Sequence, residues 1–151
     1  MTAINHALTG AIIGLVVGEP LIALPAALAS HFVCDAIPHF KSARPDTEFL
    51  NAGWFRRYLI ADASLCLLLV IVLAIFQPHH WFLASVCAFL AASPDLLWLE
   101  KYIKVRHGKS WKRNSFAKFA GGIQWFQRPI GAVVEIAWFT AALIILVPFL
   151  R

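Results

Sequence analysis

Charged residues are scarce in this sequence, and their scarcity indicates the class of protein. Only 14% of the 151 residues are Asp, Glu, Lys or Arg, whereas a soluble domain usually has about a quarter. Apolar residues make up 60% of the chain, and the mean hydropathy is +0.73. This composition is too apolar for a water-soluble protein, and the length suits one compact unit. The sequence therefore predicts a single integral-membrane domain over residues 1–151.

Several common sequence signatures are also missing. The three cysteines have no CxxC spacing and all lie in apolar runs, which predicts buried free thiols. No serine or cysteine lies in a recognisable nucleophile motif, so covalent catalysis by these residues is not expected. No basic region precedes the first apolar segment, which argues against a cleaved signal peptide. Internal repeats and low-complexity segments are absent as well.

The chain is instead rich in apolar segments, and five of them are long enough to consider as helices. They are Ile4–Gly18, Leu21–His39, Tyr58–Phe76, Trp81–Leu99 and Pro129–Leu150. A helix of about 15 residues reaches only ~22 Å, so the first segment is short for a hydrocarbon core of ~30 Å. A polar loop at Lys41–Arg57 and a basic stretch at Glu100–Arg128 separate these segments. We expect an all-α, polytopic bundle of about five helices.

The basic residues predict how the bundle is oriented. If all five segments cross the membrane, twelve of the thirteen Lys and Arg residues lie on the side of the N-terminus, and only Arg151 lies opposite. The positive-inside rule then places the N-terminus and the basic loops in the cytoplasm, with the protein in the inner membrane. Residues 110–127 mix aromatic and basic side chains, which is typical of an amphipathic segment on an anionic lipid surface. We expect lipids, and not nucleic acid, as its partner.

Polar side chains of four segments fall at one predicted depth. At 1.5 Å per residue, Asp35, Asp62, Asp95 and Glu135 all lie roughly 6–9 Å below the cytoplasmic surface. His6 begins the first segment on the same side. Chance rarely brings so many ionisable groups to one level of an apolar bundle, so we expect them to lie together.

Small residues at helical spacing predict which faces meet. His6 shares a face with Gly10 and Gly14, and Asp95 shares one with Ala84, Ala88 and Ala91. Small residues mark the faces on which membrane helices approach one another. His31, Asp35 and His39 follow at four-residue spacing and would stack on one helical face. These polar groups should therefore face the interior of the bundle.

Four carboxylates at one depth need either bound cations or protons. Imidazoles beside carboxylates suit zinc, manganese or iron better than calcium, so we expect a divalent metal ion, with zinc or manganese first. The predicted ligands are His6, His31, Asp35 and Asp95. The alternatives left open are a structural hydrogen-bonded pair of His31 with Asp35 and a helix-capping role for Asp95.

Two short motifs are similar to those of a known family. They are Met1-Thr2-Ala3-Ile4-Asn5-His6 with Gly10, and Ser30-His31 with Asp35 and Pro38. These motifs resemble the YdjM-like family of membrane-bound, metal-dependent hydrolases, and the resemblance implies that His6, His31 and Asp35 are metal-site residues. Pro94-Asp95 is similar to a Pro-Asp element of that family, although it comes later in the chain than expected. The family's His-Arg-Gly-x-Thr-His segment has no counterpart here.

These observations favour a metal-dependent hydrolase acting on a phosphate-type ester of a lipid or isoprenoid near the cytoplasmic face. Asp62 or Glu135 would be a further ligand or the general base, and His39 would protonate the leaving group. Two other functions stay open: an ion or proton transport component, in which the helices could oligomerise around a path, and a non-enzymatic membrane adaptor.

Overall fold

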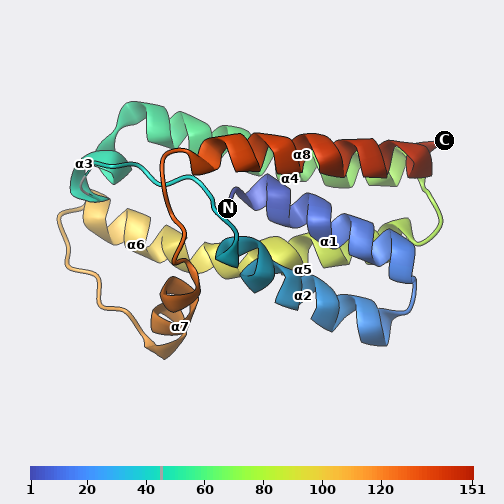
Figure 1. Ribbon diagram of the computed structural model, residues 1–151, viewed down its shortest axis with the longest axis horizontal. Helices are drawn as coiled ribbons and strands as arrows, with labels where there is room; N and C mark the ends of the chain where they lie inside the picture. The colour runs from blue at the N-terminus through green and yellow to red at the C-terminus, as the bar shows by residue number, and fades with distance from the viewer. Residues whose placement is uncertain (45) are drawn as a thin grey trace.

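The computed structural model of the chain describes residues 1–44 and 46–151, and this part of the chain is helical, with one isolated bridge between His39 and Gln127 (Figure 1). Its α-helices are α1 (Ala3–Val17), α2 (Pro20–Ala36), α3 (Asp46–Asn51), α4 (Gly53–Phe76), α5 (Trp81–Ala92), α6 (Leu96–Arg106), α7 (Ser115–Ile123) and α8 (Gly131–Leu146). Two 3₁₀ turns, η1 (Ser93–Asp95) and η2 (Val147–Leu150), follow α5 and α8. The prediction of an all-α fold is confirmed for the described residues.

Three helical stretches among the described residues are long and apolar enough to cross a membrane. They are Gly53–Phe76, Trp81–Arg106 and Gly131–Leu150. The first two helices, α1 and α2, have 15 and 17 residues, and at 1.5 Å per residue α1 reaches only about 22 Å. The predicted membrane character is therefore supported by three helices, and a count of five crossings is not confirmed.

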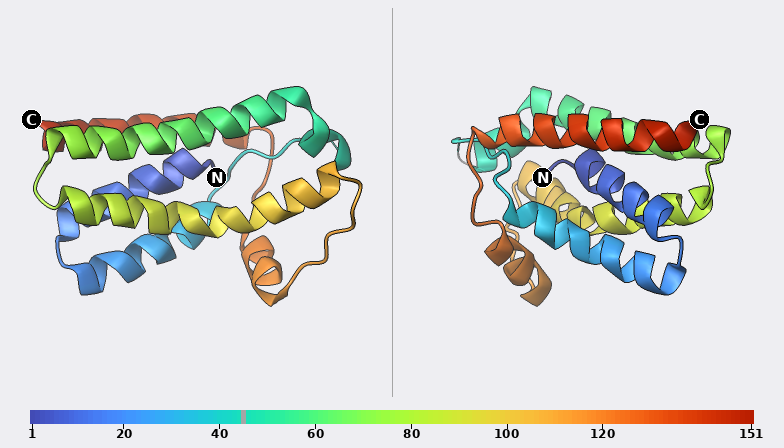
Figure 2. Two further views of the ribbon diagram at one scale, coloured as in Figure 1. Left: turned by 180° about the vertical axis from the view of Figure 1, so that it is seen from behind. Right: turned by 45° about the vertical axis from the view of Figure 1, so that its right-hand side comes forward.

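Helix α1 occupies the centre of the bundle. It contacts α2, α4, α5 and α8, and it lies between α4 and α8 on one side and α2 and α5 on the other (Figure 2). Its buried residues include the apolar side chains of Leu8 and Leu15 and, unusually, the polar side chains of Asn5 and His6. The N-terminus consequently lies near the middle of the molecule, well short of the end formed by α3 and α6 (Figure 1).

Close packing of α1 against α5 depends on glycine. A Cβ atom at Gly14 would lie 2.5 Å from the Cα atom of Ala84, and one at Gly10 would clash with the carbonyl group of Cys87. The facing residues of α5 include Ala84 and Ala88, which are fully or almost fully buried. The two predicted small-residue faces therefore meet, and their contact brings the first turn of α1 close to the end of α5.

The end of α2 differs from the prediction. The helix stops at Ala36, and Ile37 is extended, with φ −79° and ψ 151°. Because Ile37 precedes Pro38, the proline ring disfavours the helical conformation at this residue. His39 is therefore outside the helix, and the expectation that it stacks on one face with His31 and Asp35 is wrong.

Other boundaries also differ. The predicted polar loop at residues 41–57 contains α3 and the start of α4, and the segment expected to end at Leu99 continues as α6 to Arg106. The basic stretch at residues 100–128 contains the rest of α6 and all of α7. These helices were missed because charged residues such as Arg56, Arg57, Glu100 and Lys101 interrupt the apolar runs by which the segments were recognised.

Candidate metal centre

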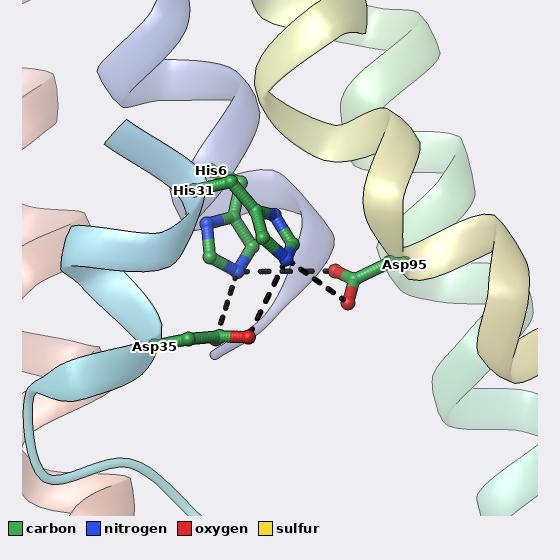
Figure 3. A group of neighbouring side chains, drawn as sticks. All are labelled: His6, His31, Asp35 and Asp95. Atoms are coloured by element: carbon green, nitrogen blue, oxygen red, sulfur yellow. Dashed lines mark ion pairs between the residues drawn. The ribbon is translucent and has the colours of Figure 1, made fainter. Parts of the chain in front are cut away.

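Four polar side chains from three elements converge in the interior of the bundle (Figure 3). His6 lies in the first turn of α1, His31 and Asp35 lie one turn apart near the end of α2, and Asp95 ends the η1 turn. The side chains of His6, His31 and Asp35 are at most 2% exposed. Asp95 is the most exposed of the four, with 25% of its side chain exposed. The sequence-predicted ligands are thus brought together.

Both imidazoles point their Nε2 atoms at the two carboxylates. The Nε2 atom of His6 lies 3.2 Å from Asp35 Oδ1 and 3.9 Å from Asp95 Oδ2. The Nε2 atom of His31 lies 3.4 Å from Asp35 Oδ2 and 4.0 Å from Asp95 Oδ1. The two rings stack, with centroids 4.0 Å apart and planes inclined by 27°. One ligand atom from each of the four residues can be chosen so that all lie within 4.8 Å of one another.

The hydrogen bonds of the two histidines favour a cation at this point. His31 Nδ1 lies 2.8 Å from the carbonyl oxygen of Ala91. Because a carbonyl oxygen can only accept, Nδ1 carries a proton, and in the neutral ring the Nε2 lone pair faces two carboxylates. Neither ring nitrogen of the buried His6 has a well-formed hydrogen bond to any described residue, although Asp35 lies near Nε2. A cation bound among these atoms would offset the repulsion between the His31 lone pair and the two carboxylates, and it would give His6 Nε2 a partner.

The donor set fits a divalent transition metal. A tetrahedral ion with bonds of about 2.0–2.1 Å holds its ligand atoms about 3.3 Å apart. The nitrogen–oxygen distances of 3.2 and 3.4 Å to Asp35 are close to this value, and those of 3.9 and 4.0 Å to Asp95 are longer. Small movements of the more exposed Asp95 side chain would bring its oxygens to the same distance from the two Nε2 atoms. The amino group of Met1, 2.6 Å from Asp35 Oδ1, is a further neighbour of this carboxylate.

Asp62 binds the start of α1. Its Oδ2 atom accepts a hydrogen bond from the Ala3 amide at 2.9 Å, and its Oδ1 atom accepts one from the Ile4 amide at 3.0 Å. The side chain of Thr2, at the N-cap position, makes no such bond. Asp62 therefore caps α1 from another helix and complements its dipole, which fixes the position of His6.

Glu135 has a comparable partner in the chain that follows α2. Its Oε1 atom accepts a hydrogen bond from the Phe40 amide at 3.1 Å. One turn before Glu135, a Cβ atom at Gly131 would overlap the backbone of His39, so α8 and the segment after α2 lie in direct contact. The predicted catalytic roles of Asp62, Glu135 and His39 stay predictions, and the structure adds a structural role for the two carboxylates.

His39 lies in the segment that follows α2, where its side chain is buried and its hydrogen bonds keep the ring neutral. Its Nδ1 atom lies 2.9 Å from the carbonyl oxygen of Ile37, and its Nε2 atom lies 3.1 Å from the amide nitrogen of the Gln127 side chain. A ring that donates through Nδ1 and accepts from this NH₂ group at Nε2 is neutral. Burial lowers the pKa of His39 below its usual value of 6.5, in agreement with this arrangement.

A cavity of about 770 Å³ opens onto the cluster. It is lined by the start of α1, the segment after α2, α3, the first half of α4, the stretch from the end of α5 into α6, residues in and around α7, and Glu135 of α8. The space lies where α1 begins and α2 ends, beyond which α4 and the stretch from α5 through α6 continue. Asp95, Asp62, His39 and Glu135 all line it.

No protein-family model, curated protein or solved structure matches this chain. The resemblance to the YdjM-like family therefore stays a prediction.

Gln124 is the site residue that the sequence reasoning undervalued. Its amide nitrogen donates a hydrogen bond of 2.7 Å to Asp35 Oδ2, and its Oε1 atom accepts one of 2.8 Å from Gln127. Gln127 in turn contacts His39. A chain of side-chain hydrogen bonds therefore runs from His39 through Gln127 and Gln124 to Asp35 in the metal-ligand cluster. The only sequence signal was a pair of glutamines in a basic loop, and nothing in their spacing links them to a residue 89 positions earlier.

Proposed function

We propose that this protein is a membrane-embedded, metal-dependent hydrolase that acts on a phosphate-type ester of a lipid or isoprenoid. The observation that carries the proposal is the pair of buried, stacked imidazoles whose Nε2 atoms face two carboxylates beside a large cavity. When bound there, a divalent ion such as zinc or manganese would lower the pKa of a coordinated water toward neutrality and polarise the attacked ester. His6, His31, Asp35 and Asp95 would hold it.

The chain's own residues support the other requirements of such a reaction. Asp95 is the ligand that faces the cavity, so an incoming ester would meet the site there. Glu135 lines the cavity with one oxygen bound to Phe40, whereas each oxygen of Asp62 already accepts a backbone amide. We therefore favour Glu135 over Asp62 as the base that takes the proton of water. His39 is neutral, which suits accepting a proton or hydrogen bond better than donating to a leaving group.

Basic side chains around the cavity suit an anionic substrate. Lys41, Arg44 and Arg113 line it together with the three carboxylates, and Lys101 lies over the rings of Trp98 and Trp111, 5.7 and 5.9 Å from their centroids. Positive charge at the entrance would attract a phosphate group and compensate its charge near the metal ligands. This arrangement supports a phosphate ester more than a neutral ester.

The same end of the molecule suits contact with anionic lipids at the cytoplasmic surface. Phe119 on α7 is 55% exposed and Trp125 is 71% exposed, and Lys118 directly precedes Phe119 in the sequence. Aromatic side chains beside basic ones bind the headgroup region of an anionic leaflet. A site at this level would receive a phosphate headgroup while its hydrocarbon tail stays in the bilayer.

Phosphate release from farnesyl phosphate tests the proposal. Purified wild-type protein, freed of metal with a chelator, should release phosphate only after zinc or manganese is restored. The His31→Ala and Asp35→Asn variants should lose at least about 100-fold in rate, because each removes a ligand. His79→Ala, which changes an exposed histidine at the opposite end of the molecule, is the matched control and should keep the wild-type rate.

Chelator-resistant phosphate release, or equal rates in His31→Ala and His79→Ala, would contradict a metal-dependent hydrolase. Ion flux through proteoliposomes that is lost in the same variants would instead favour the transport alternative.

A further inference from the structure

A second, smaller hollow lies between α4 and α5. It has a volume of about 220 Å³ and is lined by Ala7, Cys66, Leu67, Val70, Ala88, Phe89 and Ala92. Helix α1 supplies Ala7, helix α4 supplies residues 66–70, and helix α5 supplies residues 88–92. We call this hollow the α4–α5 groove. It covers four residue steps of each flanking helix, or about 6 Å along its axis.

The groove adjoins the cavity at the candidate metal centre. Cys66, Phe89 and Ala92 line both spaces. Along α4, the chain passes from Asp62 in the cavity to Cys66 at the junction and on to Val70 in the groove. Along α5, Ala92 marks the junction and Asp95 lies one turn further on, in the cavity. A ligand could therefore occupy both spaces at once.

The two spaces differ sharply in chemistry. All seven residues that line the groove are apolar, whereas the cavity carries carboxylates and basic side chains. The outer edge of the groove lies on the surface of two helical stretches, Gly53–Phe76 and Trp81–Arg106, that are apolar and long enough to span a membrane: Leu67 is 62% exposed and Phe89 is 63% exposed. This combination suits an amphiphile with a charged head and an apolar chain.

We propose that the α4–α5 groove holds the first part of the hydrocarbon chain of the substrate, while its phosphate head lies in the cavity beside Asp95. The inference rests on the proposed function for the identity of the head. Beyond the groove the chain would continue among the surrounding lipids, because the groove is only about one helical turn long. Seating the chain would orient the phosphate ester toward the metal ligands and exclude water-soluble phosphates that lack a chain.

Photo-crosslinking tests this placement directly on the full chain in lipid nanodiscs. The probe is dodecyl phosphate with a diazirine near its phosphate end. We expect labelled peptides from residues 66–70 of α4 and 88–92 of α5. An excess of unlabelled dodecyl phosphate should prevent the labelling, and the same excess of inorganic phosphate should not. Competition by farnesyl phosphate shows whether the groove also accepts the branched chain of an isoprenoid.

Two neighbouring substitutions on α4 give a matched comparison. Val70→Trp fills the end of the groove, whereas Ile71→Trp places the same ring next to it on α4, at a residue that does not line the groove. If the new ring displaces two methylene groups of the probe, labelling affinity should fall about tenfold in Val70→Trp and stay at the wild-type value in Ile71→Trp. Leu67→Trp and Leu68→Trp, both at exposed positions, repeat the comparison if Val70→Trp does not fold.

Equal affinity in the two variants of a pair, or labelling spread evenly over the outer surface of α8, would overturn the inference. Failure of the groove proposal can be distinguished from failure of the proposed hydrolase function. Groove labelling in a protein that binds no metal would leave a lipid site and remove the hydrolase. Metal-dependent phosphate release without groove labelling would leave the hydrolase and remove the chain site.

Discussion

His31 donates its Nδ1 proton to the carbonyl group of Ala91, and this hydrogen bond leaves the Nε2 lone pair facing Asp35 and Asp95. His6 presents its own Nε2 atom from the opposite helix at a similar distance from Asp35. Hydrogen bonds to the far side of a ligand are what orient metal-binding residues in general. At the scale of single residues, the site therefore depends on which groups hold the four ligands in place.

Gln124 holds Asp35 and should control metal affinity. Replacing it with leucine removes the hydrogen bond of 2.7 Å to Asp35 Oδ2, and loss of such a partner typically weakens metal binding about 10–100-fold. Gln127→Leu is the control, because Gln127 contacts Gln124 and His39 but is not in hydrogen-bond contact with a predicted ligand among the described residues. Competition with a zinc chelator measures both affinities, and an unchanged affinity in Gln124→Leu would remove this role.

His39 should make the protein less stable in acid. Burial lowers its pKa in the folded protein below the usual 6.5, so the unfolded chain binds a proton more readily. The folded state is therefore favoured fully above about pH 6.5 and loses stability as the pH falls below that value.

In the His39→Gln variant, glutamine keeps a hydrogen-bond acceptor for Gln127 but does not titrate. Its thermal unfolding midpoint should fall less than that of the wild type between about pH 7.5 and about pH 5.5. Parallel curves for the two proteins would show that His39 does not titrate in this range.

The convergence of the four candidate ligands was predictable from the sequence because their types, depths and small-residue neighbours agree. His6, His31 and Asp35 lie at helical positions, where a period of 3.6 residues links spacing to direction. The placements of His39 and Gln124 were not predictable in the same way. Each lies outside a helix, and their positions depend on the bridge between His39 and Gln127, a contact between segments 88 residues apart.

At the scale of helices, the close contact of α1 with α5 sets the distance between His6 and Asp95. Gly10 and Gly14 allow the two backbones to approach, and Asp62 fixes the start of α1 through two backbone amides. The 3₁₀ turn at Ser93–Asp95 then redirects the chain between α5 and α6. The small-residue faces were visible in the sequence. Ser93-Pro94-Asp95 also indicated a cap or kink at a helix end, but proline does not distinguish a 3₁₀ turn from the first turn of a new helix, where it is also found.

Gly14→Ala should loosen this contact. The added Cβ atom would lie 2.5 Å from the Cα atom of Ala84, which belongs to the backbone and cannot move aside alone. Overpacking of this kind costs about 1–3 kcal/mol in the free energy of unfolding, or roughly 2–4 °C of unfolding midpoint per kcal/mol for a chain of this size.

Gly122→Ala on α7 is the matched control, because no described atom lies within 4 Å of the position of its Cβ. Its midpoint should stay near that of the wild type or rise slightly, since alanine favours helix. Equal midpoints for Gly14→Ala and the wild type would contradict the close packing of α1 on α5.

At the scale of the whole molecule, unequal helix lengths create the site. Helix α4, with 24 residues, and the 26-residue stretch of α5, η1 and α6 extend past the start of α1 and the end of α2, and the cavity lies in the space between them. The length of Ile4–Gly18 indicated a short first helix. The lengths of single segments do not show, however, that the start of α1 and the end of α2 lie side by side inside longer helices.

The same architecture should place the basic end of the molecule in the cytoplasm. A cysteine at exposed Ser110, between α6 and α7, should react with a membrane-impermeant maleimide in inside-out vesicles, and one at His79, between α4 and α5, should react in right-side-out vesicles. The native cysteines at positions 34 and 87 are buried, and Cys66 is partly buried within α4. The reverse labelling pattern would invert the orientation.

The metal content of the purified full chain decides whether the cluster of His6, His31, Asp35 and Asp95 is a metal site. We expect about one zinc or manganese ion per chain in the wild type and in His79→Ala, and little of either in His6→Ala and His31→Ala, because each of the latter removes one of four ligands. Elemental analysis after dialysis against metal-free buffer measures the ratio. A folded wild-type protein that retains no metal, and takes up none when zinc and manganese are supplied, would contradict the account.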